Sequence, residues 1–211
     1  MSRTKNKPLP ITLCVITANS GKRIKDVVLK HKKYVSEVLV VVQKSEDDTL
    51  ARAREVADCV IERRNKGTSD PDRNWLFDLA SNPWVLYLDD DEFISPKLAK
   101  NLKKLIESNV DVFWLQRDNF VNNKDISAIL GKDYQARLFR KGSLRFPDEI
   151  HTYPTLANEA ISAYVDYPII HKRGLEQLKK SNRARNCVAS REQIGNQEKF
   201  IADVERYLGS L

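Results

Sequence analysis

The chain has 211 residues, of which 41% are hydrophobic and 31% are charged, and its formal net charge is +7. This composition fits one α/β domain or two small ones, and it excludes a disordered chain. The basic surplus is spread along the sequence without a zinc-finger spacing or an RNP motif, so we expect no nucleic-acid partner.

The sequence contains neither a disulfide framework nor a membrane span. Cys14, Cys59 and Cys187 are too few and too scattered for disulfides or a zinc site, which favours a reducing compartment. The apolar run Ile11–Ile16 is too short for a signal peptide, and no run approaches the ~20 residues that cross a bilayer. We therefore expect a cytoplasmic protein whose only membrane contact would be peripheral, at the inner face.

Strands and helices are predicted to alternate through the first half of the chain. Residues 1–10 are basic and polar, and we expect them to form a disordered leader. The predicted strands are Ile11–Ile16, Val38–Val42, Cys59–Ile61, Trp84–Leu88 and Val112–Leu115. The helices between them are indicated by the apolar face of Ile24, Val27 and Val28, by the cap residues Ser45–Asp48 before a helix to Ala57, by Asp72–Ala80, and by the Ser95-Pro96 start. This order predicts an α/β fold with a mostly parallel sheet flanked by helices.

The pattern changes after Arg117. We expect a loop over Asp118–Lys132, strands at Tyr134–Arg140 and Ile169–His171, and a helical segment over Gly174–Leu208. No linker composition separates the halves, so residues 11–211 are predicted to form a single domain. Its two halves would be a nucleotide-binding half at 11–117 and an acceptor half at 118–211.

Four consecutive acidic residues follow the predicted strand Trp84–Leu88, namely Asp89, Asp90, Asp91 and Glu92. Ligands of open α/β sheets bind beyond the carboxyl ends of the strands, and a hard divalent cation would offset the repulsion among carboxylates. If the extended path continues, Asp89 and Asp91 share one side and can bind one ion. The alternative is an acidic loop before the helix at Ser95, which explains one or two of the four acids.

Short polar motifs follow the strands in a particular order. After the first strand comes Thr17-Ala18-Asn19, and after the second an Asp- and Thr-rich turn within Val38–Thr49. The remaining motifs, in chain order, are Arg73-Asn74, Leu88–Glu92, Arg137-Leu138-Phe139-Arg140, Ile150-His151 and His171. Over roughly Pro10–Asn186 this ordered set resembles family 2 glycosyltransferases, in particular the small bacterial lipopolysaccharide-core type.

The resemblance implies a GT-A-type fold, similar to a Rossmann fold, with a helical C-terminal segment. It implies an inverting hexosyl- or heptosyltransferase of cell-envelope polysaccharide biosynthesis. The donor would be a nucleotide sugar, with a UDP-sugar favoured, and the acceptor a saccharide or a lipid-linked glycan. The cofactor would be a divalent cation, Mn²⁺ or Mg²⁺. The oligomeric state is left open.

The resemblance also implies roles for individual residues. Donor-binding residues would be Thr17, Asn19, Gln43, Asp48, Arg73, Asp89, Asp90 and Arg137. Metal ligands would be Asp89, Asp91 and His171. The general base would be Glu149, then Asp148, with His151 as a further candidate.

The sequence departs from the family pattern at two positions. Gln43 stands where the family has an Asp that reads the nucleotide base, and Thr152 stands where an acid follows the histidine. These departures keep open a catalytically degenerate binding module. A nucleotidyltransferase is disfavoured because such an enzyme usually has a glycine-rich phosphate loop after its first strand, and here the turn after that strand contains only Gly21. Candidate walls for a sugar ring are Trp75, Trp84, Trp114 and Tyr153, of which Trp84 is expected in the core.

Overall fold

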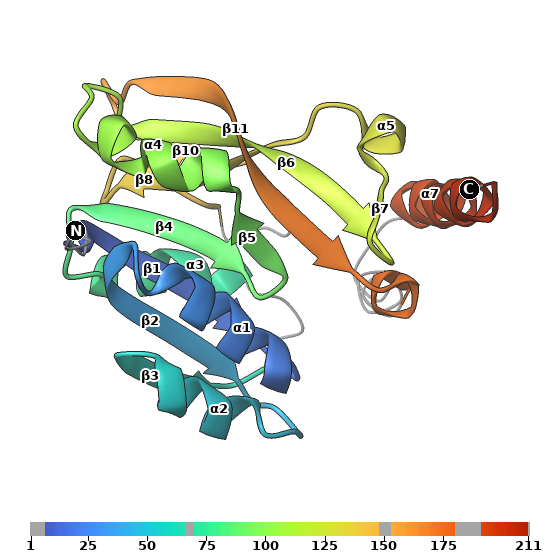
Figure 1. Ribbon diagram of the computed structural model, residues 1–211, viewed down its shortest axis with the longest axis horizontal. Coiled ribbons are helices and arrows are strands. Elements are labelled where there is room, and N and C mark those ends of the chain that lie inside the picture. The colour runs from blue at the N-terminus through green and yellow to red at the C-terminus, as the bar shows by residue number, and fades with distance from the viewer. Residues whose placement is uncertain (1–6, 66–69, 148–152, 180–190, 211) are drawn as a thin grey trace, which may run out of the picture. The chain divides into compact units, whose positions relative to one another are not determined.

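The computed structural model describes residues 7–65, 70–147, 153–179 and 191–210 (Figure 1). The chain divides into two compact units. The first unit comprises Met1–Gln116 and Tyr134–Ile169, and the second comprises Arg117–Asp133 and Ile170–Leu211.

The described elements alternate in the first half and become mainly strands in the second. The strands are β1 (Leu9–Thr17), β2 (Val35–Gln43), β3 (Cys59–Arg63), β4 (Trp84–Asp89), β5 (Glu92–Ile94), β6 (Val112–Val121), β7 (Lys124–Asp125), β8 (Tyr134–Arg140), β9 (Leu144–Arg145), β10 (Thr155–Leu156) and β11 (Ser162–Arg173). The helices are α1 (Gly21–His31), α2 (Thr49–Val56), the 3₁₀ turn η1 (Asp70–Asp72), α3 (Arg73–Leu79), α4 (Pro96–Ile106), α5 (Ser127–Leu130) and α7 (Arg191–Gly209).

The central sheet has the strand order β3-β2-β1-β4-β8-β6-β11-β5, and β7 pairs with β6. Strands β3, β2, β1 and β4 are parallel to one another. Strand β8 is antiparallel to both β4 and β6, so β6 runs in the same direction as β4. The predicted α/β class with a mostly parallel sheet is thus confirmed. The insertion of β8 into the gap between two parallel strands was not predicted.

Helices cover both faces of the parallel strands (Figure 1). Apolar side chains of α1, α2 and α4 pack on one face, including Val27, Ala53 and Leu102. Helix α3 packs on the opposite face through Leu76 and Phe77. Because β1, β2 and β4 are covered on both faces, most of their residues are apolar, which is why the sequence located them correctly.

Two predicted strand boundaries are wrong. Strand β1 begins at Leu9, inside the predicted leader, because the Leu9 amide donates to the Tyr34 carbonyl at 3.0 Å. The predicted strand Ile169–His171 is the end of a much longer strand, β11. Exposed and part-buried residues alternate along most of β11, so only its apolar end resembled a buried strand.

The predicted loop over Asp118–Lys132 is also wrong. It contains the end of β6, the short strand β7 and the helix α5. The predicted helical segment Gly174–Leu208 includes α7 and helical residues 175–179, while residues 180–190 lie outside the described part of the chain.

The second unit has its own small apolar cluster. Its buried members are Val121, Ile126, Leu178 and Val204. Lys124 donates from Nζ to the Leu208 carbonyl at 3.1 Å, which ties β7 to the end of α7. None of the helices in the described ranges is both long and apolar enough to span a membrane.

Candidate active site

The first unit brings three strand ends together at the carboxyl edge of its parallel sheet. Strand β1 lies between β2 and β4, with Thr17 opposite Val42 and Ile16 opposite Asp89. The turns that follow these strands carry Thr17, Asn19, Gln43 and the acidic residues after β4. The sequence-predicted residues of the first half of the chain therefore meet at one edge, as expected for an open α/β sheet.

The acidic run does not continue as an extended strand. Strand β4 ends at Asp89, residues 90 and 91 form a turn, and Glu92 begins β5. The expected alternation of Asp89, Asp90 and Asp91 along an extended path is therefore wrong. The turn instead sends the carboxylates to different partners.

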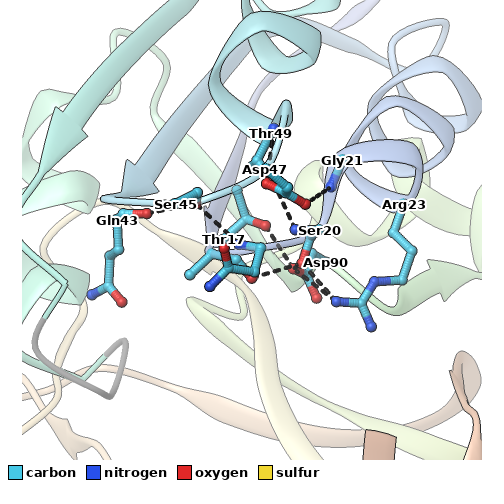
Figure 2. A network of polar contacts seen from close by, with 11 residues as sticks. Thr17, Ser20, Gly21, Arg23, Gln43, Ser45, Asp47, Thr49 and Asp90 are labelled. Atoms are coloured by element: carbon cyan, nitrogen blue, oxygen red, sulfur yellow. Dashed lines mark hydrogen bonds and ion pairs between the residues drawn. The ribbon is translucent and has the colours of Figure 1, made fainter.

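Asp90 binds the turn between β1 and α1, as Figure 2 shows. Thr17 donates from Oγ1 to Asp90 Oδ2 at 2.6 Å, and the Ser20 hydroxyl donates to the same oxygen. Arg23 Nη2 donates to Ser20 Oγ at 2.6 Å and lies 3.8 Å from Asp90 Oδ2. Burial and the charge of Asp91 raise the pKa of Asp90, although Arg23, Ser20 and Thr17 oppose the rise. Asp90 thus fixes the β1 turn against the β4 turn.

Asp89 and Glu92 share one buried arginine. Arg137 Nη2, on β8, donates to Asp89 Oδ2 at 2.7 Å and to Glu92 Oε1 at 2.8 Å. The guanidinium carbon lies 4.7 Å from the centre of the Tyr87 ring. Burial lowers the pKa of Arg137, but Asp89 and Glu92 raise it by more, so the guanidinium stays charged. Arg137 therefore supplies part of the positive charge for which a metal ion was predicted.

The turns after β1 and β2 are joined by polar side chains. Asn19 has the positive backbone angle φ of 50°, which asparagine tolerates better than most residues. Its side-chain oxygen accepts from the Glu46 amide at 2.8 Å. Asp47 accepts from the Gly21 amide at 3.2 Å and also from Thr49 (Figure 2). Asn19 and Asp47 therefore hold the two turns side by side.

Asp48 forms an ion pair within its own helix and also lies close to Gly21, at the start of α1. Its Oδ2 accepts from Arg52 Nε at 2.6 Å on the first turn of α2. A Cβ atom added at Gly21 would meet Asp48 Oδ1 at 2.2 Å. The close approach of the two turns thus favours glycine at this position.

Gln43 lies at the end of β2 and bonds a buried carboxylate. Its Nε2 donates to Asp72 Oδ2 at 3.0 Å, and Arg63 Nε lies 2.9 Å from Asp72 Oδ1. The Arg63 guanidinium stacks over the Trp75 ring, with its central carbon 4.2 Å from the ring centre. Asp72 and Arg63 are not among the sequence-predicted site residues. The signal available for Asp72 was its place at the N-cap of α3, directly before Arg73.

Arg73 and Asn74, at the start of α3, contact the segment that precedes the candidate bases. Arg73 Nε donates to the Tyr87 hydroxyl at 3.2 Å, and its guanidinium lies over the Phe146 ring at 4.8 Å. Asn74 makes two bonds to the Phe146 backbone, accepting from its amide at 3.0 Å and donating to its carbonyl at 2.7 Å. The candidate bases Asp148, Glu149 and His151 lie outside the described residues.

His171 lies in the second unit and has a defined tautomer. Asn119 Nδ2 donates to the Arg117 carbonyl at 3.2 Å and lies 3.3 Å from Asp133 Oδ2, which fixes the orientation of the amide. Asn119 Oδ1 therefore accepts from His171 Nδ1 at 2.7 Å. Donation from Nδ1 to a neighbouring oxygen is the arrangement common in metal-binding histidines.

Carboxylates near the acidic turn do not form a preformed metal cage. Asp91 is 4% exposed, and Asp89 is engaged by Arg137. Across the residues that the structure describes, no group of three or more His, Cys, Asp and Glu side chains is placed to hold a metal ion. A cation here would take much of its coordination from a bound ligand.

In comparisons with known proteins, the sequence is similar to glycosyltransferases. The sequence model described as "Glycosyl transferase family 2" matches residues 12–164. An uncharacterized glycosyltransferase of Rickettsia felis is 31% identical over 99 residues, which are 47% of this chain and 35% of that protein. A counterpart from Rickettsia conorii is 29% identical over the same lengths. The chain spans about a third of the length of these curated relatives.

Solved structures share the fold at low sequence identity. The S. aureus protein TarS, solved in complex with UDP, has a TM-score of 0.57 and 17% identity, covering 92% of this chain and 70% of that one. Glucosyl-3-phosphoglycerate synthase from Mycobacterium tuberculosis, solved with Mn²⁺, UDP and glucosyl-3-phosphoglycerate, has a TM-score of 0.51 and 18% identity, covering 82% of this chain and 76% of that one.

Proposed function

Because the chain belongs to glycosyl transferase family 2, we propose that it transfers a sugar from a nucleoside diphosphate sugar to a hydroxyl group of a saccharide or lipid-linked glycan. The fold shared with the solved proteins confirms the predicted GT-A fold. The observation that carries the proposal is the meeting of the β1, β2 and β4 turns at one edge of the sheet. Donor, phosphates and reacting sugar would lie across that edge.

The proposed reaction inverts the configuration of the anomeric carbon. The acceptor oxygen forms a bond to that carbon on the face opposite the diphosphate, the carbon–oxygen bond to the diphosphate breaks, and the hydroxyl proton passes to a protein base. Glu149 is our first candidate for the base, followed by Asp148 and His151. Asn74 anchors the chain two residues before Asp148 through its two bonds to Phe146.

The donor end of the proposed site is built from neighbouring turns. Gln43 and Asp72 would face the nucleotide base, with Trp75 and Arg63 beside them. Thr17 and Asn19 shape the β1 turn, and we propose that this turn contacts the nucleoside. A UDP-sugar is favoured because both solved relatives described above were crystallised with UDP.

We propose that a divalent cation, Mn²⁺ or Mg²⁺, binds with the donor. Such an ion neutralises charge that develops on the leaving diphosphate. Asp91 and Asp89 would be its carboxylate ligands. His171 is the third ligand that the sequence resemblance implies, and it stays a prediction. The residues fit an ion that shares its coordination with phosphate oxygens, since Mg²⁺ is commonly bound by one or two carboxylates plus substrate phosphates.

We also propose that the transferred sugar is a hexose or a heptose and that the product is part of a cell-envelope polysaccharide.

The test of this proposal is the variant Asp91→Asn. The substitution removes one negative charge with little change of shape, so donor turnover should fall by about 100-fold or more while the fold is retained. Turnover is measured as UDP release from UDP-glucose, UDP-galactose and UDP-N-acetylglucosamine with Mn²⁺. Glu107→Gln is the matched control, because Glu107 is 61% exposed at the end of α4. Undiminished turnover by Asp91→Asn would refute the metal-assisted mechanism.

A further inference from the structure

Four aromatic side chains form a continuous cluster in the first unit. Trp114 on β6 stacks with Tyr164 on β11, with ring centres 5.7 Å apart and an interplanar angle of 20°. Tyr153 contacts the same Trp114 ring at 6.2 Å, and Tyr134 on β8 meets Tyr164 edge to face at 5.1 Å. We call Trp114, Tyr134, Tyr153 and Tyr164 the aromatic patch.

The aromatic patch rests on a buried tryptophan and presents two exposed tyrosines to solvent. Trp114 is 9% exposed and belongs to the core cluster under α3, which positions the rings that lean on it. Tyr164 and Tyr153 are 65% and 76% exposed, far more than a core role requires. Tyr134 donates from its hydroxyl to Asp166 Oδ1 at 2.6 Å, so a carboxylate lies beside the rings. The patch thus combines exposed aromatic rings with hydroxyl and carboxylate groups.

The patch lies on strands that also build the candidate active site. Tyr134 begins β8 and precedes Arg137, the partner of Asp89, by three residues. Three residues of extended strand span about 10 Å, roughly the length of two sugar rings. Tyr153 directly follows residues 148–152 in sequence, which include the candidate bases. A chain of sugars on the patch could therefore present a hydroxyl to the donor.

We propose that the aromatic patch binds sugar rings of the acceptor saccharide. This inference rests on the proposed function and adds the acceptor's chemistry to it. The apolar C–H face of a pyranose ring packs on an aromatic ring, while its hydroxyls bond polar groups at the ring edge. Tyrosine suits this task because it offers an apolar ring and a polar tip. The acceptor is therefore a saccharide whose rings can cover the patch rather than a small alcohol.

The size of the patch favours a saccharide over a second protein. A tyrosine buries about 150–250 Å² when fully covered, so two partly exposed tyrosines offer on the order of 300 Å². A stable protein interface needs about 800 Å² from each partner. The exposed part of the patch is too small for such an interface, but it matches the faces of one or two sugar rings.

The experiment compares glycan binding by the wild-type chain and by variants of the patch. An immobilised glycan array identifies the oligosaccharide that binds best, and its Kd is then measured by titration in solution. Tyr164→Ala and Tyr153→Ala should each weaken binding by about tenfold, which corresponds to the loss of about 1.4 kcal/mol from an aromatic contact. Tyr164→Phe keeps the ring and should bind within about threefold of wild type. Leu29→Ala is the control, because Leu29 is 54% exposed on α1.

UDP affinity with Mn²⁺ separates this inference from the proposed function. The inference predicts unchanged UDP affinity in the Tyr153 and Tyr164 variants. If the wild-type chain binds UDP but no glycan of the array, or if the alanine variants bind glycan as wild type does, the patch is not the acceptor site. If light scattering shows a dimer that both alanine variants break, the patch is an interface between copies, and the inference is overturned. If the wild-type chain does not bind UDP with Mn²⁺, the result counts against the proposed function itself.

Discussion

At the scale of single residues, the acidic turn is organised by positive side chains from distant parts of the sequence. Arg137 binds Asp89 and Glu92, and Arg23 lies beside Asp90. The sequence showed four adjacent acids and no compensating charge nearby, so a cation was predicted to offset all four. Arg137 was identified only through family resemblance, because its contact with Glu92 spans 45 residues and depends on the register of β8.

The first prediction concerns this buried ion pair. Arg137→Met should lower the free energy of unfolding by about 3–5 kcal/mol, because it leaves the fully buried Glu92 carboxylate without its cation. Urea unfolding measures the change. The double variant Arg137→Met with Glu92→Gln should recover part of the loss, since a neutral amide is cheaper to bury. If the two substitutions simply add, Arg137 does not stabilise the fold through Glu92.

At the scale of elements, the end of α1 is tied to β5 by a buried histidine. His31 is 1% exposed, and its Nδ1 lies 2.6 Å from the Val27 carbonyl, which can only accept. Its Nε2 lies 3.0 Å from the Ile94 amide, which can only donate. The ring is therefore neutral, with its proton on Nδ1. Protonation of Nε2 would place its N–H group against the N–H group of Ile94.

This arrangement predicts a pH-dependent stability. Burial, together with Lys30 and Lys33, lowers the pKa of His31 from 6.5 to about 4, although the Val27 carbonyl opposes the fall. Between these two values the unfolded chain binds more protons than the folded chain, so stability rises with pH. The contribution of neutral His31 to the free energy of unfolding is fully present above pH 6.5. It is lost as the pH falls toward 4, and it amounts to about 3 kcal/mol.

The measurement is the free energy of unfolding of the wild-type chain and of His31→Gln from pH 7.5 down to 4. Carboxylates and the other two histidines are present in both proteins, so their titration cancels in the difference. The stability advantage of the wild type over His31→Gln should shrink as the pH falls. A difference that stays constant over this range would show that His31 is not held neutral by burial.

The elements also show what the sequence could predict. Strands β1 to β4 are apolar runs, and α4 has the predicted Ser95 cap, whose hydroxyl accepts from the Leu98 amide at 3.1 Å. These features depend only on neighbouring residues, so the sequence predicted them. Strand β8 was found as a strand, but its place between β4 and β6 depends on pairings far apart in sequence. The three-residue strand β5 carries too short a pattern to be recognised.

At the scale of the whole molecule, the order of polar motifs along the chain was more informative than any single motif. The turns after β1, β2 and β4 meet because parallel neighbours end at one edge, which the alternating pattern already implied. The pairing of Asp72 with Arg63 could not be predicted, because the two residues lie on different elements and nothing local in the sequence indicates that they meet. The metal ion is a proposal, supported by the nearly buried Asp91 carboxylate in the turn after β4.

The most direct test of metal-assisted donor binding is a thermal-shift screen of UDP, GDP, ADP, CDP and dTDP, each with and without Mn²⁺. A ligand at 100 times its Kd stabilises the folded chain by about 2.7 kcal/mol, which raises the Tm of a chain of this size by about 5 °C or more. We expect one nucleoside diphosphate, UDP, to produce this rise only with Mn²⁺. If the folded protein responds to none of them, or responds to UDP equally without Mn²⁺, the proposed metal-dependent donor site is wrong.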